Sequence, residues 1–366
     1  MNSLPLYVEE EAQCSGELQQ RRMIIDRITC DSVTDHGAWD DLASQLGGGF
    51  FHCYAYAASE SCSSNTRALF VKAFDQQGDC VGIAIGHVVS PRVWPFTTVC
   101  KTAVFGALPA TKYKSVDAQQ AIMAAIEREL KRRGVYQLKV SAYDSVDSGS
   151  VLSALSYELT DRVEICLDMS YPIDELWKQL KGSRRTDIRK ATKLGVETKV
   201  ENSRACIQQL HRFQAQSLTR QGVLFDFNMA NDSSKNILLD AGRGMLLMSY
   251  HGGVSVNAAF FGVFGDKAYY LASGSSIEGN KCCGSAHLLW TAIELLKNQG
   301  VRTLNLGGVV GGAGDVDSKN GLYSFKQDFG GVVLPEPAGV KVISQTGAKL
   351  NTALNMLKRT ALACRS

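Results

Sequence analysis

The chain of 366 residues is long enough for two domains, and its hydrophobic content of 45% can fill two cores. Its net charge of +3 is too small to indicate a nucleic-acid-binding protein by overall charge. The eleven cysteines include no Cys-x-x-Cys pair, and neither a signal sequence nor an apolar run near the roughly 20 residues of a membrane helix is found. We therefore expect reduced thiols and a soluble, cytoplasmic protein without a disulfide framework.

The first part of the chain is predicted to contain a loose arm and one domain. Residues 1–22 are polar and include three consecutive glutamates, which is typical of a flexible terminus. Residues 23–165 are predicted to form the N-terminal domain. Apolar strands are expected at 66–74 and 80–89, and a later helix stops at Gly134 before another strand.

The same order of elements occurs again in the second part of the chain. Strands and a helix are expected at 245–250, 254–264, 267–273 and 287–299. The helix again stops at a glycine, Gly300, and aligning Gly300 with Gly134 places Leu288 on Ile122. We interpret the repetition as two similar α/β halves.

A basic segment lies between the two halves. Residues 178–199 contain eight lysines and arginines against two acidic residues. At helical spacing Arg185, Arg189 and Lys193 share one face, and Gly195 supplies the stop. Charges of one sign repel each other unless an anion binds, and arginine binds phosphate oxygens in a bidentate way. We predict phosphate binding by Arg184, Arg185, Arg189, Lys190 and Lys193, with a solvated helix surface as the alternative.

A second anion site is predicted where the helix near residue 287 begins. The sequence Lys281-x-x-Gly284-x-Ala286 places a basic residue and a glycine at the helix N-terminus, where backbone N–H groups and the helix dipole favour a phosphate. The equivalent stretch of the first half does not match, so only the second half is expected to bind a donor in this way. The predicted donor-binding residues here are Lys281, Gly284, Ser285 and Ala286, and an ordinary helix start is the alternative.

Other catalytic motifs are missing from the sequence. There is no Gly-x-Ser-x-Gly, no His-Glu-x-x-His and no suggestive pair of carboxylates, and none of the six histidines lies in a catalytic pattern. No metal site is predicted, because the adjacent Cys282 and Cys283 have no nearby Cys or His partner in sequence. These observations argue against hydrolases and metalloenzymes.

Three segments together resemble the FemAB/FemX family of aminoacyltransferases within the GNAT (N-acyltransferase) superfamily. They are the basic run 183–196, the helix and strand of 289–306, and Phe325-Lys326-Gln-Asp-Phe329-Gly330-Gly331. The resemblance implies two GNAT-like domains in tandem, each a mixed, mostly antiparallel sheet flanked by helices. The N-terminal copy would be degenerate, and residues 166–340 would hold the donor and catalytic site.

The resemblance also implies transfer of an acyl group from an activated ester or thioester to an amine. In peptidoglycan-modifying members the donor is an aminoacyl-tRNA and the acceptor a nucleotide- or lipid-linked muropeptide, so a phosphate-bearing precursor of the cell envelope is the expected acceptor. The Lys281 loop instead resembles the coenzyme A loop of acetyltransferases, which leaves acyl-CoA-dependent acylation of an amino sugar or small amine as an alternative. A non-catalytic binding module is a further one. No permanently bound cofactor is expected.

Individual site residues follow from the same resemblance. Lys326 corresponds to the lysine that the family is proposed to use at the reacting centre, with a solvated surface lysine as the alternative. Tyr323 is a candidate to protonate the leaving group or a core residue, and Phe325 is expected to set the direction of Lys326. By analogy with the superfamily, the strand around Leu271 and Gly274 is expected to separate from its neighbour and offer backbone N–H groups to the donor and the oxyanion. The long helical hairpin of staphylococcal-type members is missing.

The last segment, residues 341–366, is predicted to form an amphipathic helix. Leu350, Leu354 and Leu357 fall on one helical stripe, with basic residues near it. Docking on the protein is the expected role of the stripe, and weak contact with an anionic membrane surface is the alternative.

Overall fold

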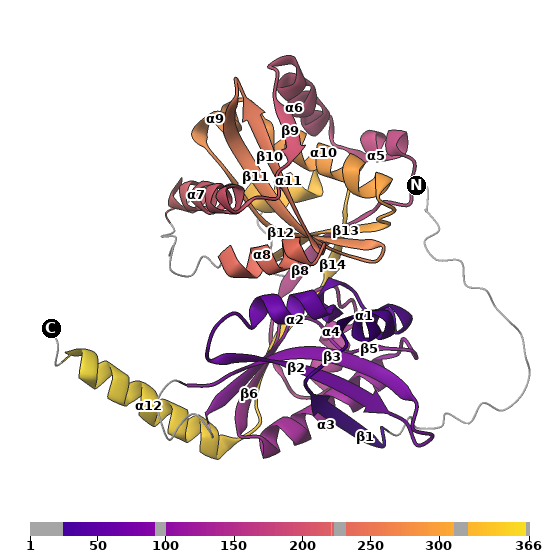
Figure 1. Ribbon diagram of the computed structural model, residues 1–366, viewed down its shortest axis with the longest axis vertical. Helices are drawn as coiled ribbons and strands as arrows, with labels where there is room; N and C mark the ends of the chain where they lie inside the picture. The colour runs from indigo at the N-terminus through magenta and orange to yellow at the C-terminus, as the bar shows by residue number, and fades with distance from the viewer. Residues whose placement is uncertain (1–24, 92–99, 221, 223–231, 311–320, 364–366) are drawn as a thin grey trace, which may run out of the picture.

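The computed structural model describes residues 25–91, 100–220, 222, 232–310 and 321–363. Two domains are stacked end to end, the first half of the chain forming one and the second half the other (Figure 1). Each contains a mixed sheet flanked by helices, so the predicted fold class is confirmed. The predicted arm, residues 1–22, lies outside the described residues.

The first sheet has the strand order β1-β2-β3-β4-β6-β15-β7, with β5 paired to β3. Its strands are β1 (Arg27–Asp31), β2 (Thr66–Phe74), β3 (Cys80–Val89), β4 (Lys101–Phe105), β5 (Ala110–Thr111), β6 (Val135–Val140), β7 (Glu158–Thr160) and β15 (Ala338–Val342). The helices of this domain are α1 (His36–Gln45), the 3-10 helix η1 (Phe50–His52), α2 (Tyr54–Glu60), α3 (Val116–Arg132) and α4 (Ser148–Ala154).

The second sheet has the order β14-β8-β13-β12-β11-β10-β9. Its strands are β8 (Arg162–Asp168), β9 (Glu197–Val200), β10 (Gly244–His251), β11 (Val254–Phe264), β12 (Lys267–Ser275), β13 (Thr303–Val310) and β14 (Val332–Pro335). The helices are α5 (Ile173–Gln179), α6 (Gly182–Lys193), α7 (Arg204–Arg220), α8 (Asp232–Asp240), α9 (Ile277–Lys281), α10 (Gly284–Asn298) and α11 (Gly321–Gln327).

The internal repeat is present in the fold. The series β2-β3-β4-α3-β6 corresponds to β10-β11-β12-α10-β13, and in both series the last strand runs parallel to the third. Gly134 and Gly300 follow their helices with φ of +79° and +88°, the left-handed conformation in which glycine ends a helix at no steric cost. Ile122 and Leu288, aligned by the sequence, are both buried.

The two domains exchange a strand. β7 and β8 are consecutive in the chain but lie in different sheets, and the same is true of β14 and β15. As a result β8 is inserted between β13 and β14, while β15 is inserted between β6 and β7. The sequence-based boundary after residue 165 therefore falls inside β8, and the end of the predicted second domain falls inside a strand of the first sheet.

The two parallel pairs differ in how far they extend. β4 and β6 pair from Lys101 to Phe105, along the whole of β4. β12 and β13 pair only from Lys267 to Tyr269, and then they separate. Just beyond that point, the register between β11 and β12 shifts so that Leu271 forms a bulge opposite Phe260 and Phe261. The second sheet is therefore opened in its middle.

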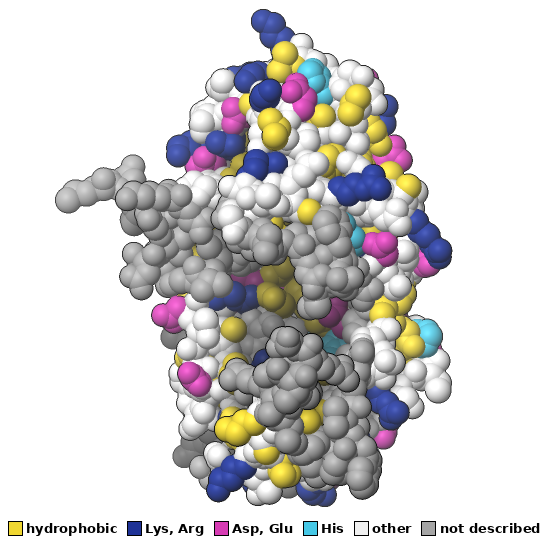
Figure 2. All heavy atoms as spheres, turned by 90° about the vertical axis from the view of Figure 1, so that its left-hand side faces the viewer, with side chains coloured by type: hydrophobic (Ala, Val, Ile, Leu, Met, Phe, Trp, Pro, Cys, Tyr) yellow, Lys and Arg dark blue, Asp and Glu magenta, His cyan; other side chains and the backbone are white. Residues whose placement is uncertain are grey.

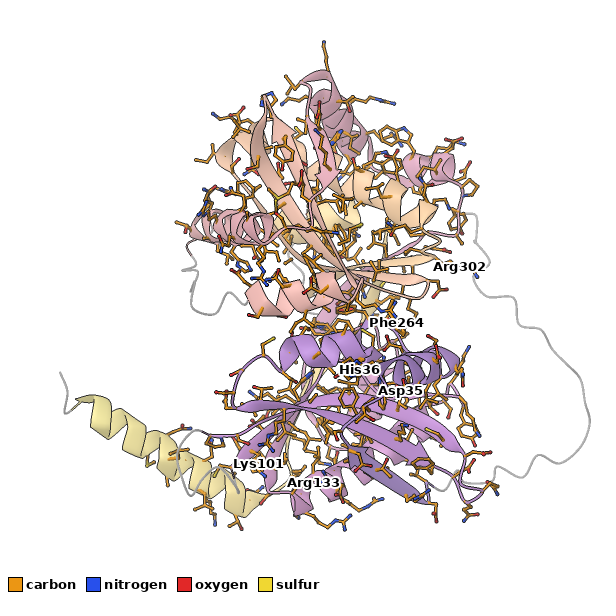
Figure 3. All side chains as sticks on the ribbon, viewed as in Figure 1. Asp35, His36, Lys101, Arg133, Phe264 and Arg302 are labelled. Carbon is orange, nitrogen blue, oxygen red and sulfur yellow. The ribbon has the colours of Figure 1, made fainter. Side chains whose placement is uncertain are left out.

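Apolar packing and ion pairs join the domains. One buried cluster includes Phe51 of the first half and Phe260 of the second. Arg243 forms an ion pair of 3.0 Å with Asp40 of the first half and lies over the ring of Phe264, which is at the junction between the domains (Figure 3). Helices α2 and α8 face each other across the same junction (Figure 1).

The C-terminal helix α12 (Gln345–Ala363) projects from the first domain (Figure 1). Leu354 is buried and Leu350 is exposed, whereas the side chain of Leu357, the third leucine of the predicted stripe, lies outside the described residues. Among the described residues, none of the helices is both long and apolar enough to cross a membrane. Membrane contact through α12 stays a prediction.

Candidate active site

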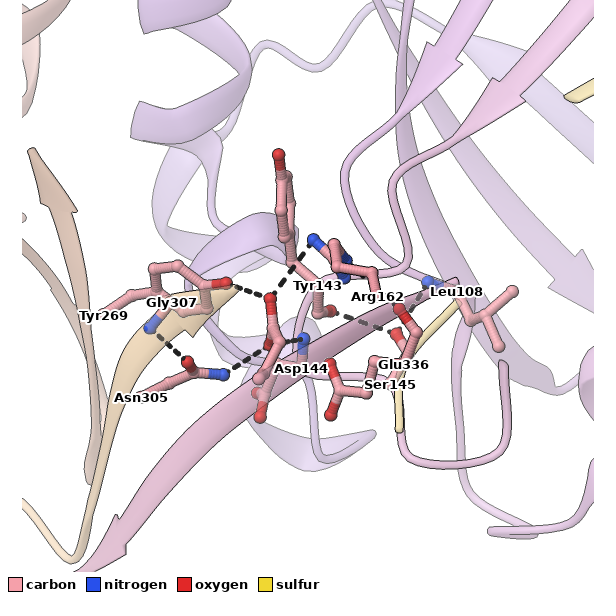
Figure 4. A network of polar contacts seen from close by, with 10 residues as sticks. Leu108, Tyr143, Asp144, Ser145, Arg162, Tyr269, Asn305, Gly307 and Glu336 are labelled. Carbon is pink, nitrogen blue, oxygen red and sulfur yellow. Dashed lines mark hydrogen bonds and ion pairs between the residues drawn. The ribbon is translucent and has the colours of Figure 1, made fainter. Parts of the chain in front are cut away.

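The point where β12 and β13 separate is held by a buried carboxylate. The last parallel pair is Tyr269 with Asn305, and both side chains donate hydrogen bonds to Glu164 of β8. One comes from the Tyr269 hydroxyl, and the other comes from Asn305 Nδ2 over 2.6 Å. Glu164 is fully buried, accepts a third hydrogen bond from the backbone N–H of Asp144 (3.1 Å) and forms an ion pair with Arg162 (3.3 Å) (Figure 4). The network ties both strands to the domain junction.

Beyond this pair, β13 turns at Gly307. The Gly307 N–H donates to Asn305 Oδ1 over 2.7 Å, and its φ of +79° is the left-handed region that favours glycine. The register with β8 shifts at the same place, between Asn305 and Gly308. Asn305 therefore bonds to Glu164 with one end of its amide and to the turn with the other.

Lys326 of α11 reaches this turn. Its side chain is buried, and a Cβ placed on Gly307 would lie 3.4 Å from Lys326 Nζ. Within the described part of the chain, no hydrogen bond or ion pair reaches Nζ. Burial lowers the pKa of Lys326 to about 8, and the negative charge of Glu164 acts in the opposite direction. Lys326 is thus a buried lysine that titrates near neutral pH, not a solvated one.

A cavity of 560 Å³ lies between the domains beside Lys326. Aromatic residues of both halves line it, with Phe51, Tyr56 and Tyr143 from the first half and Tyr269 and Tyr270 from the second. Figure 2 shows hydrophobic side chains at this level, in a recess between the domains. We call it the junction cavity.

The junction cavity also carries charge. Among the residues that the structure describes, Arg162, Lys235 and Lys326 line it together with one acid, Glu60. Burial lowers the pKa of Lys235 and raises the pKa of Glu60, as expected where ionised groups lose water. The described part of the lining combines flat apolar surfaces with an excess of positive charge, which suits a ligand with a ring and an anionic group.

A second cavity, of 760 Å³, lies on the other side of β12. It is bounded by α6, α7, the α9–α10 connection and Phe325 of α11, and we call it the helix-side cavity. Arg184 and Arg220 line it. Arg184 is neutralised by Asp187 (3.0 Å) and Asp328 (3.3 Å), whereas Arg220 donates to the carbonyl of Ser275 over 2.9 Å.

Tyr270 lines both cavities. It is the residue directly after the last β12–β13 pair, and the Leu271 bulge follows it. Burial raises the pKa of Tyr270 to about 12, so its hydroxyl stays protonated at neutral pH. Two ligands bound in the two cavities would meet at Tyr270, close to the turn that Lys326 reaches.

The predicted donor-binding residues are distributed unevenly. Ser285, Ala286 and Gly274 line the helix-side cavity, while Leu271 lines the junction cavity. Gly284 packs so tightly on Asn257 that a Cβ would lie 2.1 Å from Asn257 Oδ1. Lys281 ends α9 with its side chain 69% exposed, and it lines neither cavity.

Gly274 has a different role from the expected one. It remains paired with Ala258 in the sheet, and a Cβ there would lie 2.3 Å from the backbone of Gln214. The glycine thus allows α7 to approach β12 closely. The separation of β12 from β13 begins five residues earlier, after Tyr269.

The predicted phosphate-binding residues of α6 do not form one surface. Only Arg184 lines the helix-side cavity, while Lys190 is exposed on α6. Arg185 donates to the carbonyls of Trp177, Lys178 and Leu180, where it satisfies the C-terminal end of α5. Arg189 and Lys193 line a separate shallow groove on the outer face of α6 and α10.

The other two predicted catalytic residues flank Lys326. Tyr323 is buried in the core of the second domain. Phe325 packs on Phe329, with ring centres 5.3 Å apart, and its ring lies under the guanidinium of Arg184. Phe325 lines the helix-side cavity and Lys326 the junction cavity, so neighbouring residues of α11 contribute to different cavities.

Sequence reasoning missed several residues of the site. Glu164 stands in the run Val163-Glu164-Ile165-Cys166-Leu167, and an acidic residue in an otherwise apolar strand is a signal for a buried polar role. Arg220 and Lys235 carried no such signal, because only the fold brings α7 and α8 to the cavities. No group of three or more His, Cys, Asp or Glu in the described ranges has the arrangement of a metal site.

Comparisons with known proteins agree with this architecture. Residues 245–340 match the model of the FemAB family. This part of the chain is similar to the FemAB family. The resemblance predicted from the sequence is therefore confirmed, and the matched range contains β12, the α9–α10 connection and Lys326. A comparison with curated protein sequences gave no match.

Solved structures share the fold at low sequence identity. The crystal structure of FemX is 15% identical, with a TM-score of 0.69, and the match covers 88% of this chain and 99% of FemX. L-PGS from Bacillus licheniformis is 12% identical, with a TM-score of 0.52 and coverage of 92% and 99%. A tandem GNAT protein from the clavulanic acid biosynthesis pathway is 10% identical, with a TM-score of 0.52 and coverage of 87% and 98%. These likenesses show a tandem GNAT-like fold along most of the chain.

Proposed function

We propose that this protein transfers an aminoacyl or acyl group from an activated donor in the helix-side cavity to an amine of an acceptor in the junction cavity. The observation that carries the proposal is that the two cavities meet at Tyr270, beside the turn that Lys326 reaches. The FemAB match and the tandem fold support an N-acyltransferase enzyme, as predicted from the sequence.

The reaction needs few side chains. The acceptor ammonium first loses a proton to solvent, and its nitrogen then attacks the carbonyl carbon of the donor. The new C–N bond forms as the ester or thioester bond breaks, and the second amine proton leaves with the alcohol or thiol. Protonated Lys326 stabilises the oxyanion by charge, and the Tyr270 hydroxyl relays the proton: it gives its own proton to the leaving oxygen or sulfur and takes up the second amine proton. Tyr270 replaces Tyr323 in this role, because Tyr323 lies in the core.

For the donor, we place aminoacyl-tRNA first and acyl-CoA second. The helix-side cavity offers Arg220, Ser217 and Ser275 to a ribose and phosphate end. The basic residue of the coenzyme A-like loop, Lys281, is directed away from the cavity. For the acceptor, the excess of positive charge in the junction cavity supports a phosphate-bearing precursor such as one of the cell envelope.

The test is a transfer assay with both donors. The purified protein is mixed with tRNA charged with a set of labelled amino acids, or with labelled acetyl-CoA, and with a nucleotide-linked muropeptide or an amino sugar as acceptor. Label in an amide product, absent with Lys326→Met, supports the proposal and identifies the donor. Calorimetric binding of a donor without turnover under any combination would instead favour the non-catalytic binding module.

A further inference from the structure

β12 and β13 separate after Tyr269, and we call the gap between them the cleft and its closed end the apex. The apex has a feature that the transfer reaction does not by itself require. Tyr269 and Asn305 form the last β12–β13 pair, and their side chains bond to the same carboxylate, Glu164. Glu164 belongs to β8, which follows β7 of the first sheet in the chain but lies in the second sheet. One side chain thus fixes the position at which the two strands separate.

The geometry extends from Glu164 to the reacting centre. Asn305 Nδ2 donates to Glu164, which leaves Asn305 Oδ1 directed at the Gly307 N–H, 2.7 Å away. Without the Asn305 amide in this position, the buried Gly307 N–H would lose its hydrogen-bond acceptor, which disfavours the left-handed turn. Since Gly307 lies against Lys326 Nζ, the same turn positions the lysine.

A second effect is electrostatic. Glu164 is fully buried, so its charge acts on Lys326 with little screening by water. The fully buried Glu336 is a neighbouring acid, and burial together with Glu164 raises the pKa of Glu336 to about 9, which keeps Glu336 neutral. Glu164 is also the ion-pair partner of Arg162, at 3.3 Å.

We propose that Glu164 is a positioning residue for acyl transfer: through Asn305 and Gly307 it fixes the point where β12 and β13 separate and holds the turn beside Lys326 in place. The proposal rests on the proposed function for its kinetic consequence only. Its structural and electrostatic consequences hold whatever the enzyme transfers.

The test compares Glu164→Gln with a matched control. Glutamine keeps the shape of the side chain and removes its charge. The control is Glu127→Gln in α3 of the first domain, where Glu127 is 13% exposed and bonds to Lys341 over 2.6 Å. Both variants lose one partly or fully buried carboxylate, but only Glu164 lies near Lys326.

The first readout is the pKa of Lys326 itself, which needs no activity. Lysines are dimethylated with ¹³C, and the Lys326 signal, identified by its loss in Lys326→Met, is followed by NMR against pH. Among the described residues, the other ionisable side chains that line the cavity with Lys326 are Tyr56, Glu60, Tyr143, Arg162, Lys235, Tyr269 and Tyr270. We expect Glu164→Gln to lower the Lys326 pKa by about one further unit, and Glu127→Gln to leave it unchanged. An unchanged pKa in Glu164→Gln overturns the electrostatic part.

The second readout is the split between kcat and KM. We expect Glu164→Gln to lower kcat about tenfold, with both KM values within about twofold of the native protein, because the carboxylate lines neither cavity. If Glu164→Gln does not fold, Asn305→Ala replaces it and breaks the link to Gly307 with the charge retained. Wild-type kcat in the folded variant overturns the positioning role. If the native protein shows no transferase activity but Glu164→Gln still shifts the Lys326 pKa, the proposed function is wrong and the effect of Glu164 on Lys326 still holds.

Discussion

The two halves share one order of elements, yet only the second half opens into a site. In the first, β4 and β6 stay paired to Phe105 and Val140, which are apolar and buried. In the second, the equivalent strands end their pairing at Tyr269 and Asn305, which bond to Glu164. A parallel strand pair becomes a cleft where polar side chains with a buried partner replace apolar packing at its end.

The exchanged strands β8 and β15 also differ between the closed first sheet and the open second sheet. In the first sheet, β15 places Gly339 opposite Val140, whereas β8 places Cys166 opposite Asn305 with Glu164 two residues away. The first half contributes to function in another way, because its η1 and α2 region supplies Phe51 and Tyr56 to the junction cavity. One copy of the repeat forms the cleft, and the other supplies a wall of the cavity.

The largest effect that tests this distinction is expected at Lys326. Changing Lys326 to Met should lower kcat by about 10²- to 10³-fold, the range found when an oxyanion-stabilising donor is removed. The same change should raise the free energy of unfolding at pH 7 by up to about 3 kcal/mol, because a buried ammonium whose pKa is reduced to about 8 destabilises the folded state. Steady-state kinetics and denaturant unfolding check the two effects.

The matching change in the first half is Lys341→Met. Lys341 forms an ion pair of 2.6 Å with Glu127, so its loss should leave activity intact and lower stability. If both lysine variants changed the free energy of unfolding in the same direction, the destabilising effect assigned to the buried Lys326 ammonium would be wrong.

The pH dependence gives the second test. If protonated Lys326 is required, kcat should fall about tenfold per pH unit above about pH 8, and Lys326→Arg should move this fall to higher pH. The folded protein binds fewer protons than the unfolded chain between about pH 8 and 10.5, so Lys326 makes stability rise with pH in that window. Unfolding curves of the native protein and Lys326→Met should differ in this slope. A kcat that does not change up to pH 10 would show that catalysis does not require protonated Lys326.

A smaller effect is expected from the turn beside Lys326. Gly307→Ala should cost about 1 kcal/mol of stability, as should Gly78→Ala in the first sheet, because both glycines have positive φ and alanine does not favour that conformation. Only Gly307→Ala should lower kcat, by about tenfold, since a 1 Å displacement of a catalytic group can have a large effect. Equal kinetics in the two variants would contradict a role for this turn.

The smallest effect is expected from the helix-side cavity. Arg220→Ala should raise the KM for the donor by about five- to tenfold, and the difference should shrink at high salt if the donor is a polyanion. Arg189→Ala, in the outer groove of the same domain, should leave the donor KM unchanged. If Arg189→Ala weakened donor binding more than Arg220→Ala does, the donor would bind on the basic helix α6 and not in the helix-side cavity.

Much of the fold was predictable because it depends on local pattern. The expected strands 66–74, 80–89 and 254–264 coincide with β2, β3 and β11, since alternating or continuous apolar runs between turns leave little choice. The stops at Gly134 and Gly300 were predictable because a left-handed residue after a helix is usually glycine.

Other features depended on contacts between distant residues. The adjacent strands β7 and β8 gave no sign in sequence that they lie in different sheets, since only their partners decide it. Cys283, which precedes α10, adopts a left-handed conformation (φ 57°) that is uncommon for a residue other than glycine and could not be predicted from its type. The motif with Lys326 could be recognised, but its burial and its lowered pKa arise from β8 and β13, which come from elsewhere in the chain.

The strand exchange also bears on how the chain is made. During synthesis, β6 and β7 emerge early, but β15, which lies between them, is about 200 residues further along. Until residues 338–342 leave the ribosome, the first sheet has two unpaired strand edges, which are sites for aggregation. We therefore expect a nascent chain cut before β15 to require chaperones or to aggregate, and the last strand to act as the closing step that completes the first sheet.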